Sequence, residues 1–86
     1  MRVENLRHHL DKLDTQLLNV LARRMQISKQ IGNYKRANNI PPPDKSRWNK
    51  VVKSRLKIAN ELNLDQQGVK EMLKIIHTMS LKQQQL

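Results

Sequence analysis

The chain has 86 residues, a formal net charge of +10 and no cysteine. This length is enough for one small domain spanning residues 1–86, and the lack of cysteine excludes a disulfide framework and thiolate zinc sites. Because no apolar run approaches the roughly 20 residues of a membrane span and no signal peptide is visible, we expect a cytoplasmic protein that does not use a membrane.

The composition favours an all-α fold with one helix-breaking segment. Glycine occurs only 2 times, the 3 prolines are all at positions 41–43, and no apolar run alternates as a strand would. We predict three helices, one long and two shorter, at about residues 4–36, 44–61 and 66–84. Asp44 and Asp65 are placed as the N-caps of the second and third helices.

The first predicted helix carries apolar residues at steps of three and four, which is typical of one packed helix face. This stripe consists of Leu6, Leu10, Leu13, Leu17, Val20, Ile27, Ile31 and Tyr34. Its missing member is position 24, which holds an arginine. A guanidinium on a buried face is costly unless it meets an anion, so we expect Arg24 to be buried and to face an anion-binding cavity. The alternative is a snorkelling side chain at the edge of the stripe.

The second helix folds back after the prolines and is expected to cover about half of the first helix. An uncovered apolar stripe is a liability in solution, so the other half needs a partner. A homodimer in which two long helices pack against each other is the economical solution.

The positive charge is concentrated in the middle of the chain and indicates an anionic partner. More than half of the 17 lysines and arginines lie between Thr15 and Asn60, where Asp44 is the only acidic residue. Nucleic acid, an acidic surface and a small polyanionic metabolite all fit this pattern. His8 and His9 point to different sides of the first helix and are interpreted as solvated, so no metal site is predicted.

Several polar residues recur at ordered spacings along the chain. The set is Leu6-Arg7, Leu13-Asp14, Arg23-Arg24, Gly32-x-x-Lys35, Pro43-Asp44-x-x-Arg47 and Ser80-x-x-x-Gln84. It resembles the all-helical chorismate mutases over nearly the whole chain. The resemblance implies an intertwined homodimer of three-helix subunits. It also implies the concerted rearrangement of chorismate to prephenate in aromatic amino-acid biosynthesis, without metal or cofactor.

The resemblance also implies roles for individual residues. Arg24 and Arg47 would hold the substrate carboxylates, and Arg7 would arrive from the first helix of the partner. Lys35 and Gln84 would hydrogen-bond the ether oxygen of the breaking bond, and they form the catalytic set together with Arg24. Preorganised charge of this kind suits a dianionic substrate and a pericyclic step that needs no nucleophile.

Three further positions belong to the binding set that the resemblance implies. Ser80 and the backbone near Asp44 would line the site and contact the ring hydroxyl or a carboxylate. Trp48 follows Arg47, where many members of the family place a glutamate that binds the ring hydroxyl. An indole N–H donates but does not accept, so this change affects substrate discrimination. Related domains fused to DAHP synthase often carry an aromatic residue there, which makes a DAHP synthase domain a candidate partner.

Three other functions are open alternatives. The Ile40-Pro41-Pro42-Pro43 loop resembles the isochorismate pyruvate lyases of the same superfamily. A regulatory domain that binds a pathway metabolite without turnover would use the same residues. A basic nucleic-acid-binding module would fit the charge, but one Tyr and one Trp offer little stacking surface, so nucleic acid is not the predicted partner.

Overall fold

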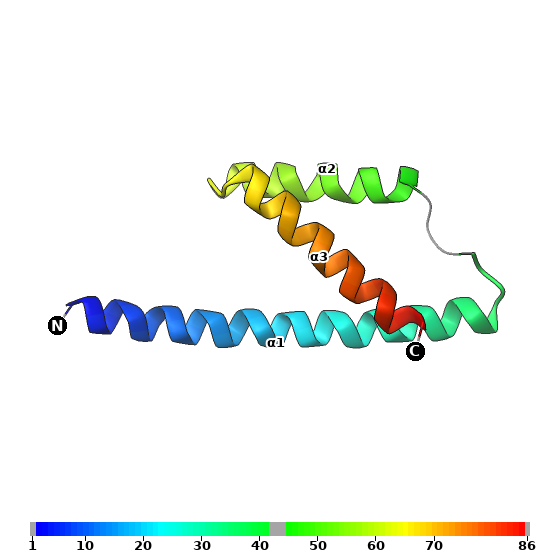
Figure 1. Ribbon diagram of the computed structural model, residues 1–86, viewed down its shortest axis with the longest axis horizontal. Helices are drawn as coiled ribbons and strands as arrows, with labels where there is room; N and C mark the ends of the chain where they lie inside the picture. The colour runs from blue at the N-terminus through cyan, green and yellow to red at the C-terminus, as the bar shows by residue number, and fades with distance from the viewer. Residues whose placement is uncertain (1, 42–44, 86) are drawn as a thin grey trace.

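The computed structural model describes residues 2–41 and 45–85, which form three helices and no strand. In chain order these are α1 (Arg2–Ala37), α2 (Lys45–Glu61) and α3 (Gln66–Gln85). Each observed bound lies within two residues of the predicted one. Figure 1 shows α1 as a single rod along the length of the molecule, with α3 running obliquely from the end of α2 to the C-terminal part of α1. The predicted all-α class with one long and two shorter helices is confirmed.

The first two helices end in the same way, on an asparagine in the left-handed region. Asn39 has φ 54° and Asn63 has φ 58°. Beyond them, the Ile40 N–H donates to the Lys35 carbonyl and the Leu64 N–H donates to the Ala59 carbonyl, both at 2.9 Å. These are the bonds of a Schellman motif, which satisfies the last carbonyls of a helix. The chain therefore turns sharply where α1 ends and again where α2 ends.

The third helix begins at the predicted N-cap. The Asp65 carboxylate accepts a hydrogen bond from the Gly68 N–H at 2.8 Å, which satisfies one of the free donors of the first turn. The other predicted cap, Asp44, lies outside the described residues.

The expectation that α2 covers α1 is wrong. Among the described residues, α3 packs against both α1 and α2, whereas no Cα atom of α2 comes within 8 Å of a Cα atom of α1. Figure 1 shows α2 set apart from α1, with α3 running obliquely between them. The apolar periodicity of a helix shows that it has a face to cover but not which helix covers it, and here α3 takes that place.

The backbones of α1 and α3 pack closely where the two helices cross. The described residues that are buried are all small, namely Ser28, Gly32, Ala59 and Ser80. A Cβ atom at position 32 would lie 2.5 Å from the Cα of Gln84 and 2.8 Å from its carbonyl carbon. Gly32 is therefore required because the backbones of α1 and α3 approach too closely for any side chain.

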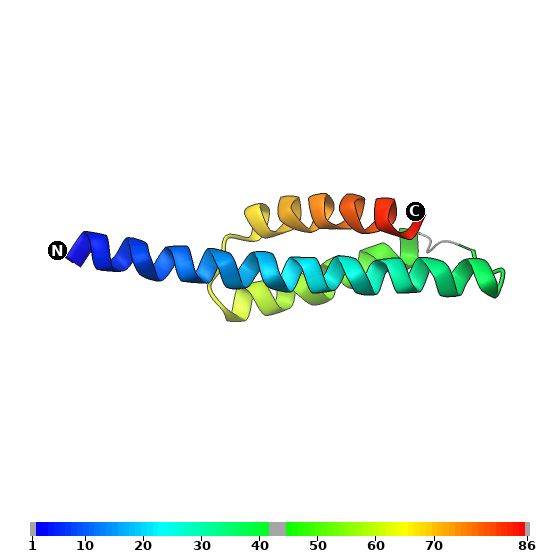
Figure 2. The same cartoon turned by 90° about the horizontal axis from the view of Figure 1, so that it is seen from below.

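Most of the apolar stripe of α1 is exposed in a single protomer. Leu6, Leu13 and Leu17 are between 57% and 62% exposed. The molecule measures 57 × 24 × 15 Å, and the N-terminal part of α1 extends beyond the other two helices (Figure 2). None of the described helices combines the length and apolarity that a membrane crossing requires.

Candidate active site

A pocket of about 310 Å³ lies between α1, the first turns of α2 and the C-terminal half of α3. Its described lining consists of Arg24, Ile27, Ser28, Ile31, Lys35, Arg47, Trp48, Val51, His77, Ser80, Leu81 and Gln84. The volume is at the lower end of the range of about 300–1,000 Å³ that is typical of small-molecule sites. Three of these side chains are cations, and none of them is a carboxylate.

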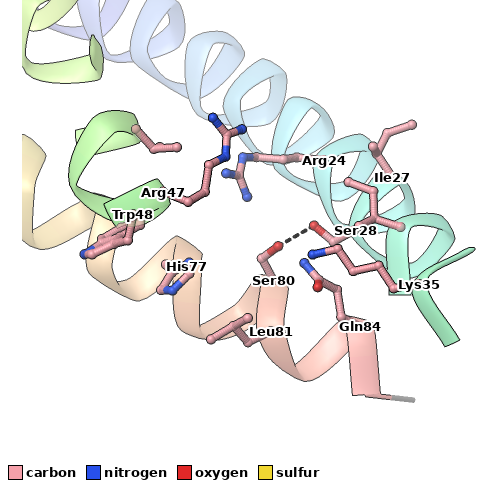
Figure 3. Close-up of a pocket in the computed structure, with 12 residues that line it drawn as sticks. Arg24, Ile27, Ser28, Lys35, Arg47, Trp48, His77, Ser80, Leu81 and Gln84 are labelled. Atoms are coloured by element: carbon pink, nitrogen blue, oxygen red, sulfur yellow. Dashed lines mark hydrogen bonds between the residues drawn. The ribbon is translucent and has the colours of Figure 1, made fainter. Parts of the chain in front are cut away.

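The pocket brings together most of the residues that the sequence singled out. Arg24 and Lys35 come from α1, Arg47 and Trp48 from α2, and Ser80 and Gln84 from α3 (Figure 3). Asp44 lies outside the described residues. Arg7 does not line this pocket.

Arg24 is exposed in the protomer, so the expectation that it is buried is wrong. The prediction that it faces a cavity is confirmed, since it lines the pocket. The reason for its exposure is that α2 stands away from α1, which leaves the pocket open beside position 24. In Figure 3, Arg24 and Arg47 point toward one another from α1 and α2. Two guanidinium groups arranged in this way create a strongly positive region that favours an anion.

Lys35 and Gln84 meet at the other end of the pocket. Both are half-buried, and Figure 3 shows the amine of Lys35 directed toward the amide of Gln84. The backbone of Gln84 is held by α1, because its carbonyl accepts a hydrogen bond from Nη1 of Arg36. The Arg36 guanidinium also donates to Oδ1 of Asn33 at 2.5 Å. This end of the pocket therefore carries two hydrogen-bond donors, the Lys35 amine and the Gln84 amide, and the backbone of Gln84 is fixed by its bond to Arg36.

Ser80 is buried and bonded to Ser28. The two hydroxyl oxygens are 2.5 Å apart, which is a short hydrogen bond between α1 and α3. No role was predicted for Ser28, which lies one turn after Arg24 and one turn before Gly32 on the same face of α1. A run of small residues at a spacing of four is the signal that could have identified this crossing.

The sequence also left His77 unassigned. Its ring stacks on that of Trp48, with centroids 4.0 Å apart and an interplanar angle of 21°. Both residues are half-buried, and both line the pocket. His77 is three residues before Ser80 and seven before Gln84, so helical spacing alone would have placed it on the pocket face of the third helix.

Arg7 lies far from the pocket of its own protomer. It is exposed and forms an ion pair with Glu4 at 3.3 Å. At 1.5 Å per residue, the Cα atoms of Arg7 and Arg24 are about 25 Å apart along α1. Arg7 therefore takes no part in the pocket of the same chain.

The helical fold and this pocket together define a class: small all-helical proteins with a cationic cavity between three helices. The sequence model of the family described as chorismate mutase type II matches residues 6–85, and the chain belongs to this family. This is a family of isomerases, and its substrate is chorismate. In the same comparisons, no curated protein and no solved structure matched the chain.

Proposed function

We propose that the pocket between α1, α2 and α3 converts chorismate to prephenate. The observation that carries this proposal is the set of three cations and one amide, Arg24, Lys35, Arg47 and Gln84, which line one small pocket in a chain of the chorismate mutase type II family. Chorismate is a dianion, and its rearrangement requires no nucleophile or general base.

The two arginines are assigned to the substrate carboxylates. A guanidinium presents two parallel N–H donors that fit a planar carboxylate, and it keeps its charge at all ordinary pH values. Arg24 and Arg47 approach from different helices, so a bound substrate would join α1 to α2 (Figure 3). Binding would also relieve the repulsion between the two cations.

Lys35 and Gln84 are assigned to the ether oxygen of the breaking bond. Negative charge grows on this oxygen in the transition state, and donors aimed at it stabilise that state more than the ground state. The pocket walls hold the flexible substrate in the compact shape that the reaction needs. An acceleration of about 10⁶-fold corresponds to about 8 kcal/mol, which orientation and preorganised charge can supply together.

The working unit is assigned as a homodimer built on α1. The radius of gyration is 16.1 Å, whereas a compact domain of this length has about 12 Å. The exposed apolar stripe of α1 is the surface on which a second copy of the chain would pack. An antiparallel pairing that brings the partner subunit's Arg7 beside Arg24 has its two-fold axis midway between them, near Thr15 and Gln16. Leu13 and Leu17 then flank the axis, where their exposed side chains pack against the second copy.

The remaining assigned residues belong to the walls of the site. Ser80 and the backbone at Asp44 are proposed to line the substrate, and Trp48 is proposed to lie against its ring. The aromatic residue at position 48 also supports a DAHP synthase as a partner. Mixing the two proteins and measuring the mass of the resulting species would test whether they form a complex. The family is typically cytosolic, which supports a cytoplasmic location.

A continuous assay of chorismate consumption and prephenate formation tests this function. The wild-type dimer should turn over chorismate, and Arg24→Ala and Gln84→Ala should each lower kcat/KM by about 10²-fold or more. Arg23→Ala is the matched control, because Arg23 is the neighbouring exposed arginine and does not line the pocket. The proposal fails if the wild type shows no turnover above background, or if Arg23→Ala and Arg24→Ala lose activity equally.

A lyase acting on isochorismate is the second candidate. The same cations would hold isochorismate, and no described carboxylate lines the pocket to select one ring isomer over the other. Release of salicylate and pyruvate from isochorismate, with no turnover of chorismate, would establish the lyase. Tight binding of a transition-state analogue without turnover of either compound would instead indicate a regulatory domain.

A further inference from the structure

The stacking of His77 on Trp48 is a feature of the pocket to which the proposed function gives no role. The rings come from different helices and lie face to face at 4.0 Å. Stacking of this kind fixes the plane of the imidazole, so that its nitrogens point in defined directions. His77 lies at one end of the row of pocket residues on α3, and Gln84 lies at the other end (Figure 3).

The pocket is rich in donors and poor in acceptors. Arg24, Lys35, Arg47 and the Trp48 indole can only donate hydrogen bonds. The hydroxyls of Ser28 and Ser80 are bonded to each other and belong to buried residues, so they are poorly exposed to a ligand. Among the described lining side chains, the Gln84 amide and the His77 imidazole are the acceptors on residues that are only half-buried. The Gln84 amide is directed at the ether oxygen in the proposed function, which leaves the His77 imidazole.

Chorismate carries one group that needs an acceptor, the hydroxyl on its ring. A hydroxyl placed in a pocket without an acceptor loses its hydrogen bond to water and gains none in return. This hydroxyl is on the carbon next to the one that bears the ether oxygen. His77 and Gln84 are two turns, or about 10 Å, apart along α3, so two neighbouring oxygens fit between their side chains.

We propose that His77 accepts the hydrogen bond from the ring hydroxyl of the bound substrate and that Trp48 holds the imidazole in position by stacking. This assignment rests on the proposed function. It makes His77 a specificity-determining residue, because a site built to bond a hydroxyl rejects the analogue that lacks it. It also assigns Trp48 a positioning role in place of direct recognition of the hydroxyl.

The test compares two substrates on two variants of His77. His77→Phe keeps a flat ring to stack on Trp48 but has no acceptor, whereas His77→Asn keeps an acceptor in a smaller side chain. The substrates are chorismate and the analogue with hydrogen in place of the ring hydroxyl. The kcat/KM of each variant is divided by the kcat/KM of the wild type on the same substrate, so that differences in the intrinsic reactivity of the two substrates cancel.

We expect His77→Phe to lower kcat/KM for chorismate by about tenfold or more and to change kcat/KM for the deoxy analogue by less than about twofold. His77→Asn should retain more activity on chorismate than His77→Phe. An equal loss on both substrates, or no loss on chorismate, overturns the role of His77 while the proposed function stands. No turnover of chorismate by the wild type overturns both.

Discussion

Replacement of Gly32 by alanine tests whether the crossing of α1 and α3 sets the geometry of the pocket. The new Cβ would lie 2.5 Å from the Cα of Gln84, whereas carbon atoms in ordinary contact are about 3.5–4.0 Å apart. Since both atoms belong to rigid helices, α3 has to move away from α1 by about 1 Å or more at this point.

This displacement acts on two features of the site. The hydroxyl oxygens of Ser28 and Ser80, 2.5 Å apart and one turn from Gly32, would separate beyond hydrogen-bonding range. The Gln84 amide would shift by a similar amount, and a 1 Å error in a catalytic group costs about 10²-fold in rate. Overpacking destabilises by about 1–3 kcal/mol, and the better helix propensity of alanine offsets about 1 kcal/mol of this. We therefore expect kcat to fall about 10²-fold with a loss of stability of about 0–2 kcal/mol.

The measurements are kcat on chorismate and the free energy of unfolding in urea. Gly68→Ala is the matched control for kcat, because the same substitution in α3 meets only the carboxylate of Asp65 and leaves Gln84 in place. It should keep wild-type kcat, and its loss of stability should not exceed the value of the Asp65 cap, about 0.5–2 kcal/mol, because the new Cβ displaces the carboxylate that caps α3. If Gly32→Ala also kept wild-type kcat, the argument that the backbone approach positions Gln84 would be refuted.

Three further predictions concern the dimer, the cap and the buried hydroxyl pair. Leu13→Asp places a charge beside the proposed two-fold axis, so the protein should sediment as a monomer and lose turnover, while Lys12→Asp on the adjacent helix position should remain a dimer. Asp65→Ala removes the N-cap of α3 and should lower the free energy of unfolding by about 0.5–2 kcal/mol, whereas Asp65→Asn should lower it by less. Ser28→Ala leaves the buried Ser80 hydroxyl without its observed partner and should destabilise by about 1 kcal/mol. The double variant with Ser80→Ala should then lose less than the sum of the two single variants.

The helices themselves could be predicted because their signals are local. The prolines at 41–43 and the cap at Asp65 mark boundaries through the chemistry of a few neighbouring atoms. The arrangement of the helices could not be predicted in the same way: the structure places α3, and not α2, against α1. Apolar spacing reports the direction of a helix face, and three amphipathic helices can pair in more than one way. Gly32 was the informative residue, since a glycine inside a long helix needs a structural reason, and here that reason is the backbone of Gln84.

The pocket was predictable in part for a related reason. Arg24 interrupts an apolar series, and Lys35 follows it on the same helix, so each departs from a local pattern. Helical spacing could have placed His77 on the pocket face of α3, but its significance depends on Trp48, which lies 29 residues earlier in another helix. The spacing of residues within each helix does not show which side chains of two helices stack. Arg24 was expected to be buried because it lies on the apolar stripe, but most of this stripe is uncovered within one chain.

The uncovered stripe of α1 connects the fold to the function. The protomer exposes 7483 Å², whereas a compact monomer of 10.2 kDa exposes about 5,300 Å². The excess of about 2,200 Å² per chain is of the size that an obligate dimer buries. The exposed stripe of α1 runs past Arg24 to Tyr34, so a second α1 that covers its N-terminal part also approaches the open side of the pocket. The same second copy can thus cover the exposed apolar stripe of α1 and close the open side of the cationic pocket. In such an arrangement the residue that breaks the apolar series is the one that ties dimerisation to catalysis.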